Sequence, residues 1–486
     1  MRTLYLAILI ILLTGLTATG QKVTISGYVT DAGSGERMIG ATIYEKATLA
    51  GTSANNYGFF SLPLARGPVE ILVSFLGYEP VVTSFDLTRD TVINFQLVLS
   101  ARQLDEVTIT ASRQSKVESS QMSMIDIPIA KFIKLPVLLG EADVLKVIQL
   151  LPGVQSGTEG STGIYVRGGG PDQNLFLLDG VPVYNASHLF GFLSVFNPDA
   201  VKSVQLYKGG FPARYGERLS SVVDIRMKEG NEKEFHGNFS IGLIASKLSL
   251  EGPIIKDKTS FIISARRTYA DLLARPLIRA YVYEEDFSST GGYYFYDLNA
   301  KINHKFSDRS RLYLSSYLGK DKAFMREKGI SYVYDETGGE KKYRDYSSEF
   351  GLGWGNLITA LRWNYLISNK IFSNTTLTYS RYVFDIFSEE KAYYFLENRN
   401  TRDYFRYFSG IEDLSARIDF DWYPSTSHSV KFGAASTYHN FKPGVTTYRY
   451  NPIESSQSID ITFGDIKIDA MEFIAYAEDN FDITPR

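Results

Sequence analysis

Short apolar runs separated by turn residues fill the first part of the chain. Between residues 22 and 99 the runs are rich in β-branched and large apolar residues and are bounded by Gly, Asn, Asp and Pro, a composition typical of short strands. The runs fall at 23–29, 41–44, 58–62, 69–75 and 91–99. This spacing predicts a small all-β sandwich over residues 21–99.

Residues 135–230 combine one helical pattern with further short strands. Apolar residues at helical spacing predict an amphipathic helix over 141–151, whose apolar face packs on a sheet. Asp179-Gly180 stands between two apolar runs and predicts a tight hairpin. The predicted strands fall at 164–166, 175–178 and 201–206. A small α+β domain is expected here.

Long alternating strands follow over residues 231–486. In residues 413–422 every second residue is apolar, and the residues between them are polar or charged. Short connections at 307–310, 368–370 and 424–428 alternate with long polar ones at about 271–293, 321–350, 385–410 and 441–468. A soluble sandwich also shows alternation. The regular change of short and long connections favours a transmembrane antiparallel β-barrel, with short turns on one side and long loops on the other.

Composition narrows the function. The 486 residues carry a net charge of -3 with no basic stripe, so nucleic acid is not an expected partner. The chain has no cysteine, which excludes disulfides, thiolate metal sites and a cysteine nucleophile. Residues 1–20 contain one positive charge, an apolar run and small residues, and therefore predict a signal peptide that is cleaved before Gln21.

Four motifs occur in one order along residues 150–216: Leu-Leu-Pro-Gly-Val, Val-Arg-Gly-Gly, Leu-Asp-Gly-Val-Pro and Ala-Arg-Tyr-Gly. Together they resemble the plug domain of TonB-dependent outer-membrane receptors. The resemblance implies that the plug fills the lumen of a 22-stranded barrel, carries part of the solute site on its outward loops, and is rearranged by energy from the inner membrane.

The sandwich carries a resemblance of its own. Gly-Ala-Thr-Ile at 40–43 and Phe-Leu-Gly-Tyr at 75–78 resemble the carboxypeptidase-regulatory-like domain that precedes the plug in Bacteroidetes receptors. The segment has no histidine, so it lacks the ligands of a zinc peptidase. No peptidase activity is expected from it.

The expected architecture is mainly β. It comprises a signal peptide (1–20), the β-sandwich (21–99), a linker (100–134), the plug domain (135–230) and a partial barrel (231–486). We count roughly nine strands in the last segment, fewer than a closed 22-stranded barrel needs. An open sheet edge in lipid leaves backbone groups unpaired. The chain is therefore expected to be a fragment of a longer receptor.

The polar linker contains a short alternating stretch at 104–111. One interpretation is a last strand of the sandwich. The other is a TonB box, an extended peptide that adds as a strand to a sheet of its partner, and the position between sandwich and plug favours it. The residues assigned to the TonB box are Leu104, Asp105, Glu106, Val107, Thr108, Ile109 and Thr110.

Candidate site residues follow from the resemblance. Ligand binding is assigned to the outward plug loops, at Asp172, Gln173, Asn174, Tyr184, Asn185 and His188. Arg167, Arg214 and Arg218 are expected to pair with acidic residues of the barrel wall and hold the plug in place. The five histidines stand at no metal-binding spacing and no nucleophile elbow occurs, so we expect no catalytic residues, no metal and no cofactor.

The predicted function is energy-coupled uptake across the outer membrane of a large, scarce solute: a siderophore, glycan, cobalamin or peptide. The expected partners are TonB with its inner-membrane energising complex, outer-membrane lipid and a surface lipoprotein lid. The alternative is a surface binding or signalling protein that acts through its β-sandwich without transport.

Overall fold

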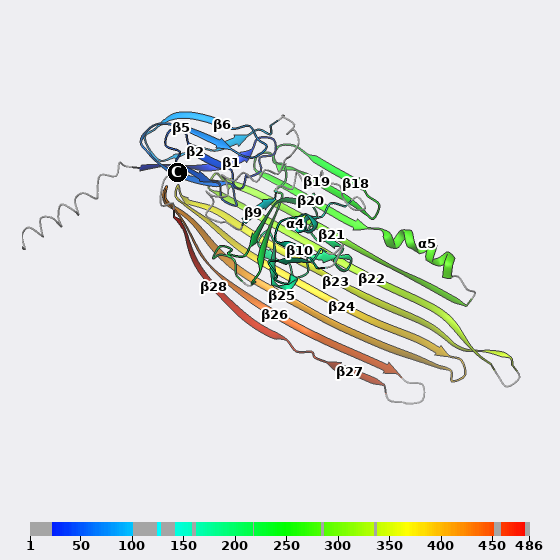
Figure 1. Cartoon of the computed structure of the whole chain (residues 1–486). Helices are drawn as coiled ribbons and strands as arrows, with labels where there is room; N and C mark the ends of the chain where they lie inside the picture. Colours follow the sequence, from blue (N-terminus) through cyan, green and yellow to red (C-terminus); the bar gives the residue numbers. More distant parts are fainter. Residues whose placement is uncertain are drawn as a thin grey trace, which may run out of the picture.

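The structure is a computed structural model of the whole chain. It describes residues 22–100, 124–127, 141–157, 162–216, 218–282, 286–334, 338–451 and 458–481. The predicted signal peptide and the predicted TonB box lie outside these ranges. Three parts are visible in Figure 1: a β-sandwich, a plug domain and a large curved sheet, which we call the wall.

The β-sandwich consists of two four-stranded sheets. One sheet contains β1 (Lys22–Asp31), β4 (Phe59–Ala65), β7 (Thr91–Val92) and β8 (Phe95–Leu97). The other contains β2 (Thr42–Glu45), β3 (Gly51–Ser53), β5 (Gly67–Ser74) and β6 (Val81–Leu87). Side chains such as Ile25, Leu62 and Ile71 fill the space between the sheets. The predicted all-β sandwich is confirmed.

The plug domain is built on a five-stranded sheet in the order β13-β12-β17-β16-β9. Its strands are β9 (Met124–Ile127), β12 (Asn174–Leu178), β13 (Val181–Pro182), β16 (Val201–Lys208) and β17 (Ser221–Met227). Asp179 and Gly180 both have positive φ, +50° and +81°, as a two-residue turn between β12 and β13 requires. This is the predicted hairpin.

One short helix and several small elements cover this sheet. Helix α4 (Val144–Gln149) begins after Asp143, whose carboxylate accepts hydrogen bonds from the backbone N–H groups of Leu145 and Lys146. The helix is shorter than the predicted 141–151 because residues 141 and 142 precede this cap and the helix ends at Gln149. The remaining elements are β10 (Val154–Ser156), β11 (Ile164–Val166), η2 (Pro171–Gln173), β14 (Ser187–His188), η3 (Leu189–Gly191) and β15 (Leu193–Ser194).

The wall is an antiparallel sheet of eleven strands, from β18 to β28. Helix α5 (Ala270–Val282) stands between β20 and β21. The strands are β18 (His236–Ile241), β19 (Ala245–Ile255), β20 (Thr259–Thr268), β21 (Phe287–Ser307), β22 (Ser310–Tyr334), β23 (Glu340–Ser368), β24 (Ile371–Tyr394), β25 (Arg399–Ser425), β26 (His428–Asn451), β27 (Ile459–Phe463) and β28 (Ile468–Phe481). We expected about nine strands; the count is higher partly because β27 and β28 both pair with β26.

The predicted short connections are confirmed, since β21 and β22, β23 and β24, and β25 and β26 pair up to their turns. Most of the predicted long loops are wrong. The segments at 321–350 and 385–410 continue the strands, and only Phe395–Asn398 separates β24 from β25. Cross-strand ion pairs such as Arg406 with Asp385 accompany these polar extensions. Polarity alone therefore did not mark a loop.

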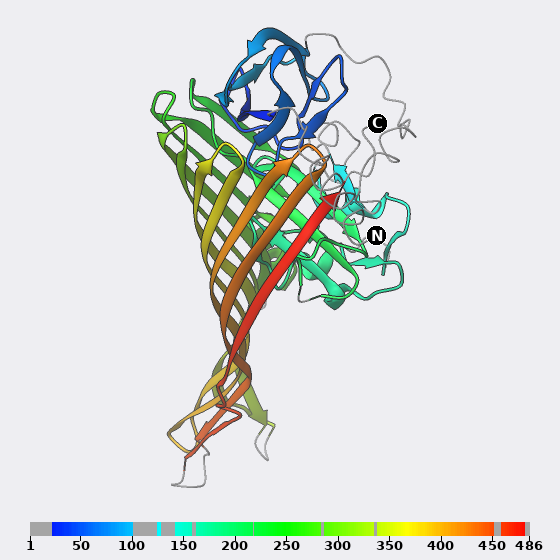
Figure 2. The ribbon, with the colours of Figure 1, turned by 90° about the vertical axis from the view of Figure 1, so that its left-hand side faces the viewer.

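The plug domain lies against the concave face of the wall, and the β-sandwich sits at the end of the wall that carries the short turns (Figure 2). We call this the turn end. Plug and wall share one apolar core, in which Tyr317, Ile358 and Ala360 of the wall pack with the plug sheet. None of the helices in the described ranges has both the length and the apolar character needed to cross a membrane.

Candidate functional site

Four of the six residues predicted to bind a solute line one pocket of about 460 Å³ in the plug domain. Asp172 comes from η2, Asn174 from the start of β12, and Tyr184 and Asn185 from the segment after β13. Gln173 and His188 are not among the lining residues, and their predicted contact with solute stays a prediction. The pocket brings together residues that are about ten positions apart because β12 and β13 form a hairpin.

The side chain of Asn174 is hydrogen-bonded to the plug domain itself. Its side chain is buried and its Nδ2 donates to the carbonyl oxygens of Ile164 at 2.7 Å and Gly170 at 3.1 Å. Its Oδ1 accepts a hydrogen bond from Ser221 Oγ at 2.7 Å. The amide thus joins three segments of the plug domain, whereas Asp172 is exposed at the pocket rim.

Tyr184 and Asn185 connect the pocket to the wall. The Tyr184 hydroxyl donates to the carboxylate of Asp413 on β25. The backbone oxygen of Asn185 accepts from Nδ2 of Asn356 on β23 at 2.8 Å, and its Oδ1 accepts from the N–H of Ser187 at 3.1 Å. This side of the pocket is therefore held by the concave face of the wall.

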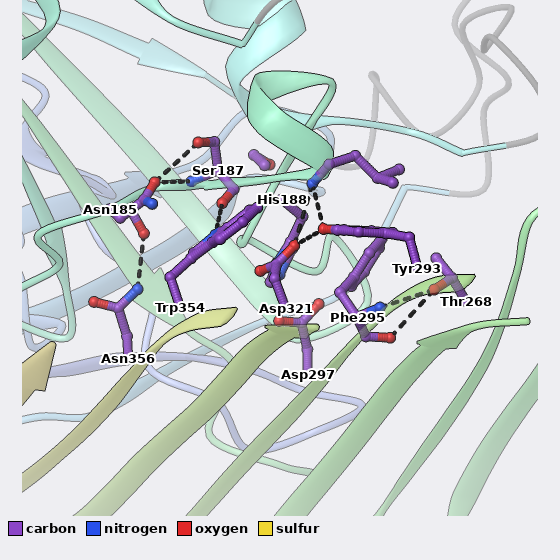
Figure 3. Close-up of polar contacts among 12 residues, drawn as sticks. Asn185, Ser187, His188, Thr268, Tyr293, Phe295, Asp297, Asp321, Trp354 and Asn356 are labelled. Carbon is purple, nitrogen blue, oxygen red and sulfur yellow. Dashed lines mark hydrogen bonds and ion pairs between the residues drawn. The ribbon is translucent and has the colours of Figure 1, made fainter. Parts of the chain in front are cut away.

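His188 lies next to this segment and is the most enclosed of the six residues predicted to bind a solute (Figure 3). Its side chain is 1% exposed, with Nδ1 at 2.5 Å from Asp321 Oδ2 and Nε2 at 2.7 Å from Asp297 Oδ1. The ring also stacks on Phe295 with 4.1 Å between ring centroids. A doubly protonated imidazolium can donate from both ring nitrogens to these two acceptors, so the geometry favours the charged form of His188.

The charge of His188 is consistent with its surroundings. Burial by itself lowers the pKa of His188, but the two carboxylates outweigh burial and raise this pKa above its usual value. Asp297 also accepts from Arg266 Nε at 2.8 Å and from the Tyr317 hydroxyl at 2.8 Å. His188 and Arg266 thus face the buried carboxylates of Asp297 and Asp321.

Side chains of the same group also hydrogen-bond to the backbone of the plug domain. The N–H of Leu189 donates to Asp321 Oδ1 at 3.2 Å and to the Tyr293 hydroxyl at 2.8 Å. Arg266 Nη2 donates to the carbonyl oxygen of Ser194 at 2.7 Å. We call this set of contacts, centred on His188, Arg266, Asp297 and Asp321, the histidine node. Its arrangement suits anchoring, since every charge in it has an opposite partner.

The Asp179-Gly180 turn forms a second ionic contact with the wall. Asp179 Oδ2 lies 3.0 Å from Lys301 Nζ, and Oδ1 accepts from the N–H of Met227 at 3.0 Å. Arg362 donates to the carbonyl oxygen of Asp179. Burial alone raises the pKa of Asp179, but Lys301, Arg362 and Arg226 prevail and lower it to about 2.

The three arginines predicted to hold the plug occupy different positions. Arg214 contacts the wall, because Nη2 lies 3.3 Å from Glu478 Oε1 and its carbonyl oxygen accepts from Arg417 at 2.9 Å. Arg167 lies beside Gly209 of the plug domain, and Arg218 lines the pocket. The predicted pairing of Arg167 and Arg218 with the wall stays a prediction.

Sequence reasoning missed Asp297, Asp321 and Arg266. The alternation of apolar and polar residues along a wall strand does not indicate which plug residue faces a given polar side chain. Within the described ranges, no group of three or more His, Asp or Glu side chains is placed to hold a metal ion.

Two domain models match the sequence. A CarboxypepD_reg-like domain matches residues 25–109, and a TonB-dependent receptor plug domain matches residues 138–223. The first match ends inside the stretch predicted as a TonB box. Both matches agree with the order of domains expected from the sequence motifs.

Curated relatives point the same way. The chain is 30% identical to the TonB-dependent receptor SusC of Bacteroides thetaiotaomicron over 224 residues, which are 44% of this chain and 22% of SusC. It is 26% identical to the vitamin B12 transporter BtuB of Vibrio vulnificus over 30% of this chain and 24% of BtuB. It is 27% identical to the ferrienterobactin receptor of Escherichia coli over 46% of this chain and 35% of that receptor. The matched part of the chain thus spans a third or less of SusC and BtuB, and 35% of the ferrienterobactin receptor.

Solved structures resemble this one only distantly. The siderophore receptor PirA from Acinetobacter baumannii is 13% identical, with a TM-score of 0.32 over 78% of this chain and 80% of PirA. The ferric yersiniabactin uptake receptor FyuA from Yersinia pestis is also 13% identical, with a TM-score of 0.34 over 74% of this chain and 61% of FyuA. At these scores the two structures add no argument of their own. The CarboxypepD_reg-like domain, the plug domain and the similarity to SusC together support a TonB-dependent receptor of SusC type.

Proposed function

We propose that this chain serves in TonB-dependent uptake of a large, scarce solute across the outer membrane. The observation that carries the proposal is a plug domain seated on the concave face of an amphipathic wall, with a pocket between its loops. The reaction is binding followed by gated translocation, with no covalent step. A surface lipoprotein lid and the surrounding outer-membrane lipid belong to the same proposal.

The solute class is a siderophore, glycan, cobalamin or peptide. The names of the relatives support this range, since they include a vitamin B12 transporter and a ferrienterobactin receptor. The pocket offers a carboxylate at Asp172, a guanidinium at Arg218 and aromatic rings at Tyr184 and Phe190. Such a mixture of polar groups and rings fits a solute with both hydrogen-bonding and apolar parts.

Coupling to TonB is proposed to act through β9. The predicted TonB box at 104–111 precedes this strand in the sequence, and among the described residues β9 is a four-residue edge strand that pairs with β16 alone. Tension applied to the preceding chain separates a short edge strand one hydrogen-bonded pair at a time. An interior strand such as β17 has to break two ladders.

The test is uptake by cells that express this receptor, measured beside solute binding to whole cells. Deletion of residues 104–111 is expected to abolish uptake and leave binding intact. Unchanged uptake after this deletion rejects the assignment of the TonB box. Binding without any uptake, in the parent as well, supports the alternative of a surface binding or signalling protein.

The pocket is tested separately by Asp172→Ala combined with Tyr184→Phe. If both side chains touch the solute, affinity is expected to fall by about 1–3 kcal/mol, or roughly 5-fold to 150-fold. Gln155→Ala changes an exposed residue of β10 and serves as the control. Equal affinity of parent, double variant and control contradicts the assignment of the pocket.

A further inference from the structure

The β-sandwich presents an aromatic surface that packs against the wall. Along β4, Phe60 and Leu62 point into the sandwich core, whereas Phe59 belongs to a separate cluster outside that core. Phe59 is 0% exposed and Tyr28, from the neighbouring strand β1, is 5% exposed. Side chains alternate between the two faces of a strand, so Phe59 points away from the interior of its own domain.

The wall supplies the other half of this contact. Phe372 stacks on Phe59 with 5.4 Å between ring centroids and an interplanar angle of 18°, and on Tyr57 at 5.3 Å and 25°. Phe59 also meets Tyr423 at 6.2 Å. We call this cluster the aromatic clasp; it consists of Tyr28, Tyr57, Phe59, Leu366, Phe372 and Tyr423.

Polar contacts surround the clasp on both sides. Asn55 Nδ2 donates to Asp421 Oδ2 at 2.8 Å, and Ser61 Oγ donates to the carbonyl oxygen of Asn369 at 2.8 Å. At the segment that leaves the plug domain, Lys233 Nζ donates to the carbonyl oxygen of Ala32 at 2.6 Å. The sandwich therefore contacts the wall turns and the plug exit at the same time.

A cavity of about 530 Å³ lies beneath the docked sandwich. Its lining comes from all three parts of the chain: Tyr57 and residues 51–56 of the sandwich, Arg226 of the plug, and Arg362 and Thr378 of the wall. The Tyr57 ring stands 5.9 Å from the Arg226 guanidinium and 5.6 Å from that of Arg362. One sandwich side chain thus faces a plug cation and a wall cation together.

We propose that the CarboxypepD_reg-like domain is a detachable cover that closes the turn end of the space between plug and wall. The inference rests on the proposed transport function and adds a second barrier behind the plug. An aromatic contact with a polar rim suits a domain that docks and leaves as a unit, as in transient interfaces. Ser100, the last described residue of the sandwich, is separated from the predicted TonB box by three residues, so the same pull reaches the cover.

The first experiment measures access to the cavity and needs no transport. Since the chain has no cysteine, Thr378→Cys creates a single thiol in the cavity lining. The full chain in opened membranes is treated with a polyethylene-glycol maleimide. Labelling is expected to be slow in this parent and about tenfold or more faster when Asn55→Asp sets a second carboxylate against Asp421.

The Asn55→Asp change is chosen because it spares the sandwich itself. Oδ1 of Asn55 accepts hydrogen bonds from the N–H groups of Tyr57 and Phe59, and an aspartate keeps this acceptor. Ser84→Asp adds the same charge at an exposed position of β6 and is expected to label like the parent. Phe372→Ala undocks the cover from the wall side. Equal labelling of the parent and both undocking variants overturns the proposal.

A reversible lock tests whether the cover has to move. Lys22 Nζ and Thr426 Oγ1 lie 3.3 Å apart at the exposed rim of the contact. Lys22→Cys with Thr426→Cys, joined by a cleavable bifunctional thiol reagent, is expected to stop uptake until the bridge is reduced. Full uptake by the locked chain overturns the proposal that the sandwich has to detach. Absence of uptake in the unlocked parent instead counts against the proposed transport function, and the labelling result then still decides the cover.

Discussion

The plug domain and the β-sandwich are held to the same wall by opposite kinds of contact. The histidine node joins plug and wall through four buried charges whose hydrogen bonds have fixed directions. The aromatic clasp joins sandwich and wall through stacked rings with a polar rim. Both contacts are buried, yet they differ in what their loss leaves behind.

A buried ion contact that loses one member leaves an uncompensated charge, which costs more than the contact contributes when complete. Stacked rings that separate become exposed apolar surface, and the cost grows gradually with area. The comparison therefore assigns different roles. The node fixes one position of the plug, and the clasp allows the sandwich to leave and return.

The largest effect is expected from His188→Asn. The change removes the imidazolium that lies against Asp321 and Asp297, so we expect a loss of about 3–5 kcal/mol in the stability of the plug-wall contact. Hydrogen exchange of residues 187–194 reports it. His236→Asn replaces an exposed histidine and is the control. If the histidine node acts as one unit, the double variant with His188→Asn and Asp321→Asn is expected to be more stable than His188→Asn alone. Losses of stability that simply add in the double variant contradict this expectation.

The next effect is expected from Phe372→Ala. Truncation of a fully buried ring costs about 3 kcal/mol, and here the cost falls on docking of the sandwich because both stacking partners belong to it. Protease sensitivity of the sandwich-to-plug connection measures the undocked fraction. Phe306→Ala removes a ring that is 63% exposed and is expected to change little. If Phe372→Ala lowers the hydrogen-exchange protection of the plug as much as His188→Asn does, the aromatic clasp and the histidine node do not have the different roles assigned to them.

Proton binding is expected to separate the two ionic contacts of the plug. The pKa of His188 is raised, so its contribution to stability is complete below about pH 6.5 and is lost as pH rises through the raised value. The pKa of Asp179 is lowered to about 2, so its contribution is present above about pH 4 and is lost as pH falls toward 2.

The Asp179 contribution corresponds to roughly 2 kcal/mol. Hydrogen exchange of residues 174–182 and 187–194, corrected for the intrinsic pH dependence, is expected to weaken at opposite ends of the pH range. The His188→Asn variant removes the alkaline loss in residues 187–194 and leaves the acid loss in residues 174–182. A common pH profile for both segments contradicts two independent contacts.

Sequence rules for turns and hairpins predicted correctly the elements that depend only on neighbouring residues. Asp179-Gly180 forms the predicted hairpin because only certain residues tolerate the required positive φ. The turn at 307–310 was also predicted from its sequence. The strand extensions at 385–410 were not predicted, because their charged residues pair across strands, as Arg402 does with Glu389.

The histidine node shows the same limit for the site. Loop position and side-chain type suggested His188 as a ligand contact, but its partners lie 109 and 133 residues further along the chain. Which wall residue faces a given plug residue depends on how the two parts are seated against each other. The outward position of Phe59 was hidden because Phe59 and Phe60 are consecutive phenylalanines on opposite faces of β4, and the sequence does not indicate which of them faces the sandwich core.

The smallest expected effect is that of Tyr184→Phe, and it separates the pocket from the anchors. The hydroxyl donates to Asp413, which keeps a second partner in His439 at 2.7 Å, so its loss costs about 1 kcal/mol of plug-wall stability. Tyr165→Phe, at a half-exposed tyrosine of β11, is the control. A fall in stability without a fall in solute affinity identifies Tyr184 as an anchor only. A fall in affinity that exceeds the fall in stability places its hydroxyl in contact with the solute, because anchoring alone cannot change binding by more than it changes the state of the plug.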